Sequence, residues 1–116
     1  MSLGLYLHIP YCFSKCRYCD FYSHPGERGV PDAYVEALLR ELSRFAPEVP
    51  LQPDTLYFGG GTPSLLRPEQ AKRLIDAARP MPGAEITLEA NPETVTEDSL
   101  RAFREAGVNR LSFGVQ

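Results

Sequence analysis

Short apolar runs alternate with longer segments in which apolar residues recur at helical spacing, and this alternation limits the possible folds more than any other feature. The short runs begin near residues 4, 54, 85 and 110 and have the length and composition of buried strands. Proline, glycine or an Asn-Pro pair stops each of the first three. The resulting strand and helix order, βαβαβαβ, predicts an α/β fold with a parallel sheet, right-handed crossovers and outer helices.

Three amphipathic helices are expected between the strands. The first spans about residues 32–45, the second begins at Pro68, and the third lies between an N-cap at Thr96 and a stop at Gly107. In the first two helices, apolar positions recur at i, i+3, i+4 and i+7, which predicts a face packed on the sheet. The expected inner residues of the first two helices are Val35, Leu38, Leu39, Leu42, Ala71, Leu74, Ile75 and Ala78.

Four parallel strands leave an apolar edge without a partner, and a closed barrel needs more strands. We therefore expect residues 1–116 to form the N-terminal part of a longer α/β barrel, incomplete at its C-terminal end. The sequence contains no flexible linker, low-complexity tract or repeat that would predict a second domain.

Composition narrows the function classes. A chain of 116 residues with 43% hydrophobic and 23% charged residues has the make-up of one soluble domain. Its formal net charge of −3 is spread along the chain, which does not predict a nucleic-acid partner. We expect no stable membrane insertion, because no apolar run approaches the roughly 18 residues of a spanning helix. The first residues have no features of a signal peptide, so a cytoplasmic location is expected.

All three cysteines, Cys12, Cys16 and Cys19, lie within eight residues in a CxxxCxxC pattern. They are expected in a loop after the first strand, at the sheet edge where α/β proteins bind ligands. An odd number of closely spaced thiols is a poor disulfide framework, but three thiolates can converge on one inorganic centre.

The residues alone leave three interpretations of these thiols. A structural zinc site would need His8 or His24 as its fourth ligand, and the spacing matches neither usual zinc pattern. Three thiols without a metal are the second interpretation. A cubane iron-sulfur cluster accounts best for the count, because three irons take thiolates and the fourth stays open to a small ligand.

Several segments resemble a known family. The CxxxCxxC pattern with Tyr18 before the third cysteine resembles the radical S-adenosylmethionine (SAM) superfamily. The wider motifs resemble the oxygen-independent coproporphyrinogen III oxidase family within it. These motifs are LYLHIPYC at residues 5–12, YFGGGTPS at 57–64, EANPE at 89–93 and LSFGVQ at 111–116.

The resemblance implies a partial (βα)6, TIM-like barrel that binds a 4Fe-4S cluster and SAM. By position, Cys12, Cys16 and Cys19 would be the cluster ligands. The SAM-binding residues implied by the same matches are Tyr6, Tyr18, Gly60, Gly61, Thr62, Glu89 and Gln116. Tyr6 and His8 also fit positions packed in the core, and no catalytic residue is assigned.

One departure separates two subfamilies. The coproporphyrinogen oxidases carry a further cysteine two residues after the third, where this chain has Phe21. A phenylalanine there resembles the HemW heme chaperones, which implies heme and a heme-acceptor protein as partners of the full-length protein. The alternatives are an anaerobic oxidase that decarboxylates a porphyrinogen, and a zinc-stabilised structural module.

Overall fold

The structure, a computed structural model, describes residues 3–11, 29–45 and 52–113. Its order of strands and helices is the predicted one, and two short 3-10 helices, η1 and η2, are added at the ends of strands. The elements are β1 (Gly4–Ile9), α1 (Asp32–Phe45), β2 (Thr55–Gly60), η1 (Pro63–Leu65), α2 (Pro68–Ala78), β3 (Glu85–Ala90), η2 (Pro92–Thr94), α3 (Glu97–Ala106) and β4 (Arg110–Phe113).

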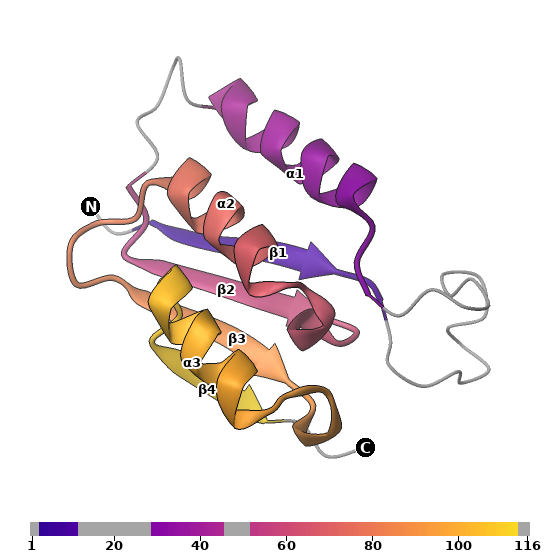
Figure 1. Cartoon of the computed structure of the whole chain (residues 1–116). Coiled ribbons are helices and arrows are strands. Elements are labelled where there is room, and N and C mark those ends of the chain that lie inside the picture. The colour runs from indigo at the N-terminus through magenta and orange to yellow at the C-terminus, as the bar shows by residue number, and fades with distance from the viewer. Residues whose placement is uncertain (1–2, 12–28, 46–51, 114–116) are drawn as a thin grey trace.

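The four strands form one parallel sheet in the order β1-β2-β3-β4. Each strand pairs with the next one in the chain, so the sheet always grows in the same direction. Right-handed crossovers then place every helix on one side of the sheet, as Figure 1 shows for α1, α2 and α3. A doubly wound sheet would reverse its direction and carry helices on both sides. The arrangement is therefore that of a TIM-like barrel, as predicted.

Alternate strand residues face the helices and form the core. Leu7 and Ile9 of β1, Leu56 and Phe58 of β2, and Leu88 of β3 are all buried there. The helices meet them with the predicted apolar stripes: Val35, Leu42, Ala71, Leu74, Ile75 and Ala78 are buried, and Leu38 and Leu39 pack partly buried against the core.

The other alternate residues give the sheet a second, polar face. Tyr6 pairs in register with Tyr57 on β2, and Glu89 pairs with Ser112 on β4. Tyr6 is 54% exposed and His8 is also exposed. The alternative of a core position for Tyr6 and His8 is therefore wrong, because the period of two in a strand turns both side chains away from the helix layer.

The ends of the last helix follow the sequence prediction. Thr96 Oγ1 accepts a hydrogen bond from the backbone N–H of Ser99, at 3.0 Å. At the other end Gly107 has φ 124° and its N–H donates to the carbonyl of Arg104. The 3-10 helices were not predicted; each begins with proline, whose fixed φ suits a first helical position.

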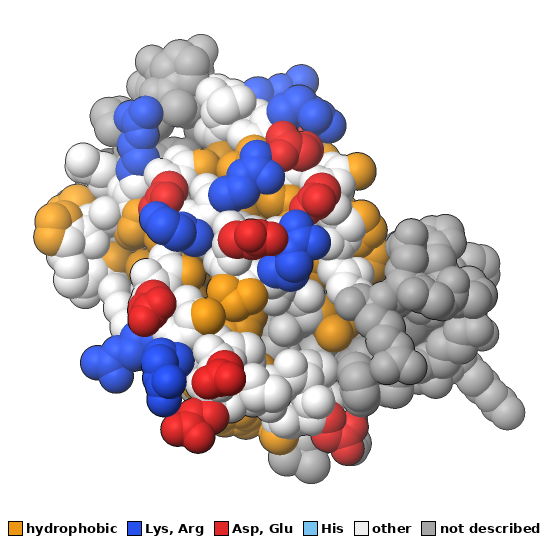
Figure 2. Space-filling view, in the orientation of Figure 1, with side chains coloured by type: hydrophobic (Ala, Val, Ile, Leu, Met, Phe, Trp, Pro, Cys, Tyr) orange, Lys and Arg blue, Asp and Glu red, His pale blue; other side chains and the backbone are white. Residues whose placement is uncertain are grey.

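Charged side chains of both signs are interspersed over the helix layer (Figure 2). Arg73 of α2 pairs with Glu36 of α1 at 2.5 Å, and Lys72 pairs with Asp76 along α2 at 3.0 Å. Exposed pairs of this kind contribute at most about 1 kcal/mol each. Within the described ranges, no helix has both the length and the apolar character needed to cross a membrane.

Candidate functional site

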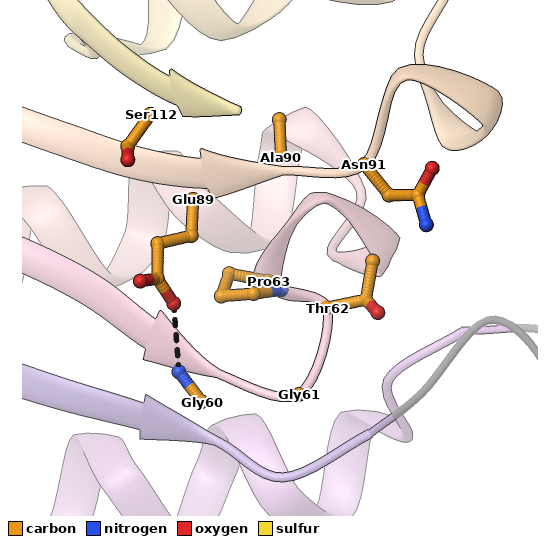
Figure 3. Close-up of a pocket in the computed structure, with 8 residues that line it drawn as sticks. All are labelled: Gly60, Gly61, Thr62, Pro63, Glu89, Ala90, Asn91 and Ser112. Atoms are coloured by element: carbon orange, nitrogen blue, oxygen red, sulfur yellow. Dashed lines mark hydrogen bonds between the residues drawn. The ribbon is translucent and has the colours of Figure 1, made fainter. Parts of the chain in front are cut away.

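The carboxyl ends of the four strands lie along one edge of the sheet, because the strands are parallel. The segments that follow β2 and β3 enclose a pocket of about 160 Å³ at this edge (Figure 3). Four predicted site residues, Gly60, Gly61, Thr62 and Glu89, line it together with Pro63, Ala90, Asn91 and Ser112. The structure thus gathers residues from three segments of the chain around one cavity.

Glu89 is the only ionisable side chain among the residues described as lining this pocket, and both of its carboxylate oxygens are held. One oxygen, Oε2, accepts from the hydroxyl of Tyr57 at 2.8 Å. The other, Oε1, accepts from the backbone N–H of Gly60 at 3.0 Å, the bond drawn in Figure 3. The hydrogen bond to Glu89, aided by some burial, raises the pKa of Tyr57 above its usual value of 10.0. The phenol of Tyr57 therefore favours its protonated form, which can donate to the carboxylate.

The glycines at the end of β2 are required by close contacts. Gly60 has φ 121°, and a Cβ there would lie 2.7 Å from the carbonyl oxygen of Ile9 and 2.9 Å from Nδ1 of His8. A Cβ on Gly59 would lie 2.7 Å from Cε2 and from the hydroxyl oxygen of Tyr6. A larger residue at Gly60 would meet the backbone of β1 and force it away from β2 at the rim of the pocket, whereas at Gly59 the side chain of Tyr6 would have to move.

Tyr6 lies beside the pocket and does not line it. Its ring stacks on the ring of Tyr57, with centroids 5.9 Å apart and an interplanar angle of 12°. Its hydroxyl lies 3.3 Å from Nδ1 of His8. Tyr57 therefore connects the predicted site residue Tyr6 with the predicted site residue Glu89.

The rim of the pocket is joined to the chain that leads into the cysteines. The N–H of Gly61 donates to the carbonyl of Ile9 at 2.9 Å, and the N–H of Thr62 donates to the carbonyl of Tyr11 at 2.6 Å. Tyr11 directly precedes Cys12 in the sequence. The pocket therefore lies next to the point where the cysteine-bearing segment begins.

The remaining predicted site residues lie outside the described part of the chain. They are Cys12, Cys16, Tyr18, Cys19 and Gln116, together with His24 and Phe21. In the ranges that the structure does describe, no group of three or more His, Cys, Asp or Glu side chains is arranged to hold a metal ion. The cluster ligands therefore stay a prediction from the sequence.

A buried serine ties the two loops of the pocket together. Ser64, in η1, accepts from the backbone N–H of Asn91 at 3.1 Å and forms a short hydrogen bond with Thr94 of η2. Thr94 in turn donates to the carbonyl of Asn91 at 2.8 Å. These contacts set the distance between the segments after β2 and β3, and hence the width of the pocket.

Some of these residues were not predicted. Tyr57 and Ser112 lie in quoted motifs, but their places depend on strand register: Tyr57 pairs with Tyr6, and Ser112 pairs with Glu89. The alternation along β2 puts Tyr57 and Gly59 on one face, which was a usable signal for Tyr57. Ser64 and Asn91 carried no such signal, because their contacts join segments 27 residues apart.

The donor set suits one end of a zwitterionic ligand. A carboxylate can accept from an ammonium group, and hydroxyl and side-chain amide groups can donate to a carboxylate. At about 160 Å³ the pocket is smaller than the roughly 300–1,000 Å³ of sites that enclose a whole small molecule. The residues fit the amino-acid end of a larger ligand, with the rest of that ligand lying outside.

Curated relatives and a solved structure resemble the chain over almost its whole length. It is 48% identical to the heme chaperone HemW of Escherichia coli (strain K12) and 42% identical to that of Bacillus subtilis (strain 168), over 98% and 96% of the chain. The chain spans about a third of the length of these relatives, 32% and 31%.

Among solved structures, coproporphyrinogen III oxidase (HemN) from Escherichia coli, a radical SAM enzyme, matches with a TM-score of 0.82. The identity is 36%, over 99% of this chain and 28% of that one. The resemblance predicted from the motifs is therefore confirmed. The model of the radical SAM superfamily matches residues 6–116, and the chain belongs to this superfamily.

Proposed function

We propose that the chain is the part of a HemW-like heme chaperone that binds a 4Fe-4S cluster and SAM. The observation that carries this proposal is the hydrogen bond from the N–H of Thr62 to the carbonyl of Tyr11. It joins the polar pocket to the residue directly before Cys12, so a ligand in the pocket would lie near a centre bound by the cysteines. The superfamily match and the HemW relatives support the same assignment.

The residues present fit both groups. The thiolates of Cys12, Cys16 and Cys19 would hold the cluster, which supplies an electron to SAM when bound. Glu89 would accept from the SAM ammonium group, with its carboxylate already oriented by Tyr57 and Gly60. Gly61 and Thr62 would line the carboxylate side of the amino-acid end, and Tyr6, Tyr18 and Gln116 would contact the rest.

Heme transfer is favoured over porphyrinogen oxidation by residue 21. The sequence has Phe21 where coproporphyrinogen oxidases carry a fourth cysteine, and the curated relatives described above are heme chaperones. We propose that the full-length protein binds heme and passes it to an acceptor protein in the cytoplasm. We also propose that residues 1–116 are the N-terminal part of its radical SAM domain.

The resemblance to the solved oxidase supports a second candidate, oxidative decarboxylation of coproporphyrinogen III. One pair of measurements on the protein extended to the length of its relatives separates the two. Heme titration followed by absorbance is expected to show stoichiometric binding. Anaerobic incubation with SAM, reductant and coproporphyrinogen III is expected to leave the substrate unchanged. Substrate turnover without heme binding would favour the oxidase.

Metal analysis tests the centre itself. After anaerobic reconstitution, the chain is expected to hold about four iron and four sulfide ions. Variants with alanine at Cys12, Cys16 or Cys19 should lose both. Zinc without sulfide in the unsubstituted chain would contradict the cluster and favour the structural zinc module.

A further inference from the structure

Gln70, in the first turn of α2, is a polar side chain buried to 1% exposure. Its carboxamide nitrogen donates to the carbonyl of Val30 and to Oδ1 of Asp32, both at 2.9 Å. Its carboxamide oxygen accepts from the backbone N–H of Arg67 at 2.8 Å. Both polar atoms of the side chain are therefore used, and the two nitrogen contacts connect α2 with Val30, just before α1, and with Asp32, its first residue.

The two hydrogen bonds donated by the carboxamide nitrogen of Gln70 are not required to cap α2. Capping the first turn of α2 requires only an acceptor for the Arg67 N–H, which a glutamate would provide as well. The contacts with Val30 and Asp32 require a donor, which glutamine has and an ionised glutamate lacks. Gln70 thus holds the chain at residues 30–32, where the segment that carries the cysteines returns to the described fold.

Tyr34, in the first turn of α1, holds the other end of that segment. Its hydroxyl donates to the carbonyl of His8 at 2.5 Å. Its ring packs edge-on against the ring of Tyr11, with centroids 5.4 Å apart and planes at 76°. Tyr34 therefore contacts the last residues of the chain before Cys12.

We propose that Tyr34 and Gln70 are positioning residues that anchor the two ends of the cysteine-bearing segment, residues 12–28, so that the cysteines can retain a cluster. The inference rests on the proposed function. Both anchors act through α1: Tyr34 lies on it, and Gln70 binds its first residue, Asp32, and the backbone just before it. Fixing the ends of a loop in advance lowers the entropy lost when ligands within the loop converge on a metal centre.

Three single variants of the chain test the anchor. Tyr34→Phe keeps the ring on Tyr11 and removes the bond to His8. Gln70→Met keeps the volume and removes all three hydrogen bonds. Arg73→Gln is the matched control, because Arg73 also links α2 to α1, through Glu36 at 2.5 Å, but touches neither end of the segment.

The first readout is the rate at which the reconstituted cluster is lost to a ferrous-iron chelator, followed by visible absorbance. Cluster loss should be about fivefold faster in Tyr34→Phe, which is the effect of about one net hydrogen bond. In Gln70→Met the loss should be at least about fivefold faster. Arg73→Gln should stay within about twofold of the unsubstituted chain. Melting temperatures of the metal-free chains show whether general destabilisation accounts for the loss.

The second readout, amide hydrogen exchange of the metal-free chains, needs no cluster. The amides of Tyr34 and Val35 donate to the carbonyl of Pro31, next to the Gln70 contacts, and should exchange faster in Gln70→Met than in Arg73→Gln. Equal exchange and equal cluster loss in these two variants would overturn the anchor and leave the proposed function standing. An unsubstituted chain that takes up no iron and sulfide would overturn both.

Discussion

Glu89 at the end of β3 accepts a hydrogen bond from the backbone N–H of Gly60 at the end of β2, across 29 positions of sequence. The strand register alone would not orient this carboxylate, because a glutamate side chain has several rotamers. The second bond, from Tyr57, fixes the other oxygen. An acidic group is thus held at the rim of the pocket before any ligand arrives, which lowers the cost of ordering it on binding.

Replacing Gly60 by alanine should destabilise the fold strongly. The residue has φ 121°, and its new Cβ would lie 2.7 Å from the carbonyl oxygen of Ile9. We expect the free energy of unfolding, measured by urea denaturation, to fall by about 3 kcal/mol.

Gly83→Ala is the control for backbone strain alone. Gly83 also has a positive φ, 80°, but a Cβ there would meet no atom within 4 Å. The free energy of unfolding of Gly83→Ala should fall by about 1 kcal/mol. Equal losses in the two variants would show that the contact with Ile9 does not constrain residue 60.

Removing the hydroxyl of Tyr57 should weaken SAM binding. In Tyr57→Phe the carboxylate of Glu89 keeps only its bond to Gly60, so its orientation is less restricted. We expect the dissociation constant of SAM, measured by calorimetry on the anaerobically reconstituted chain, to rise about fivefold.

A double-mutant cycle tests whether Tyr57 acts through Glu89. Glu89→Gln removes the charge, and in the Glu89→Gln background the Tyr57→Phe change should add less than about twofold, because the two residues form one network. Fully additive effects would mean that Tyr57 contributes to SAM binding by another route.

Ser64→Ala should loosen the pocket. Ser64 is 4% exposed, and its hydroxyl joins Asn91 and Thr94. The substitution leaves the partly buried N–H of Asn91 without its partner, so the free energy of unfolding should fall by about 1–2 kcal/mol. Ser43→Ala, which removes an exposed hydroxyl bonded to the carbonyl of Arg40, should change it by less than about 0.5 kcal/mol.

Asp32 should make stability depend on acid pH. The hydrogen bond from Gln70, followed by the charge of Arg67, holds the pKa of this carboxyl below its usual value of 3.8. The folded state therefore favours the ionised form, and its contribution is fully present above the unfolded pKa. It is lost as pH falls through the lower folded pKa.

Melting temperatures of the unsubstituted chain and Asp32→Asn check this pH dependence. The two should differ at about pH 7, and the difference should shrink as pH falls below the usual carboxyl pKa of 3.8. A constant difference across this range would show that the ionised form of Asp32 is not favoured by folding.

Local sequence determined the elements. Periodicity located α1 and α2 with their buried faces, and the Thr96 cap and the Gly107 stop located α3, because each signal depends on residues within a few positions of one another. The paired length of β2 was set by its neighbour: β2 reaches Gly60 because Gly59 and Gly60 still pair with His8 and Ile9.

The sequence by itself also determined the superfamily, the cysteine pattern and four residues that meet at one pocket: Gly60, Gly61, Thr62 and Glu89. Only the tertiary structure decided that Tyr57 holds Glu89, that Ser64 joins η1 to η2, and that Gln70 spans from α2 to the start of α1. The physical reason is distance along the chain: these bonds join residues 30 to 40 positions apart, and side-chain partners so far apart are set by strand register and helix packing, which local spacing does not encode.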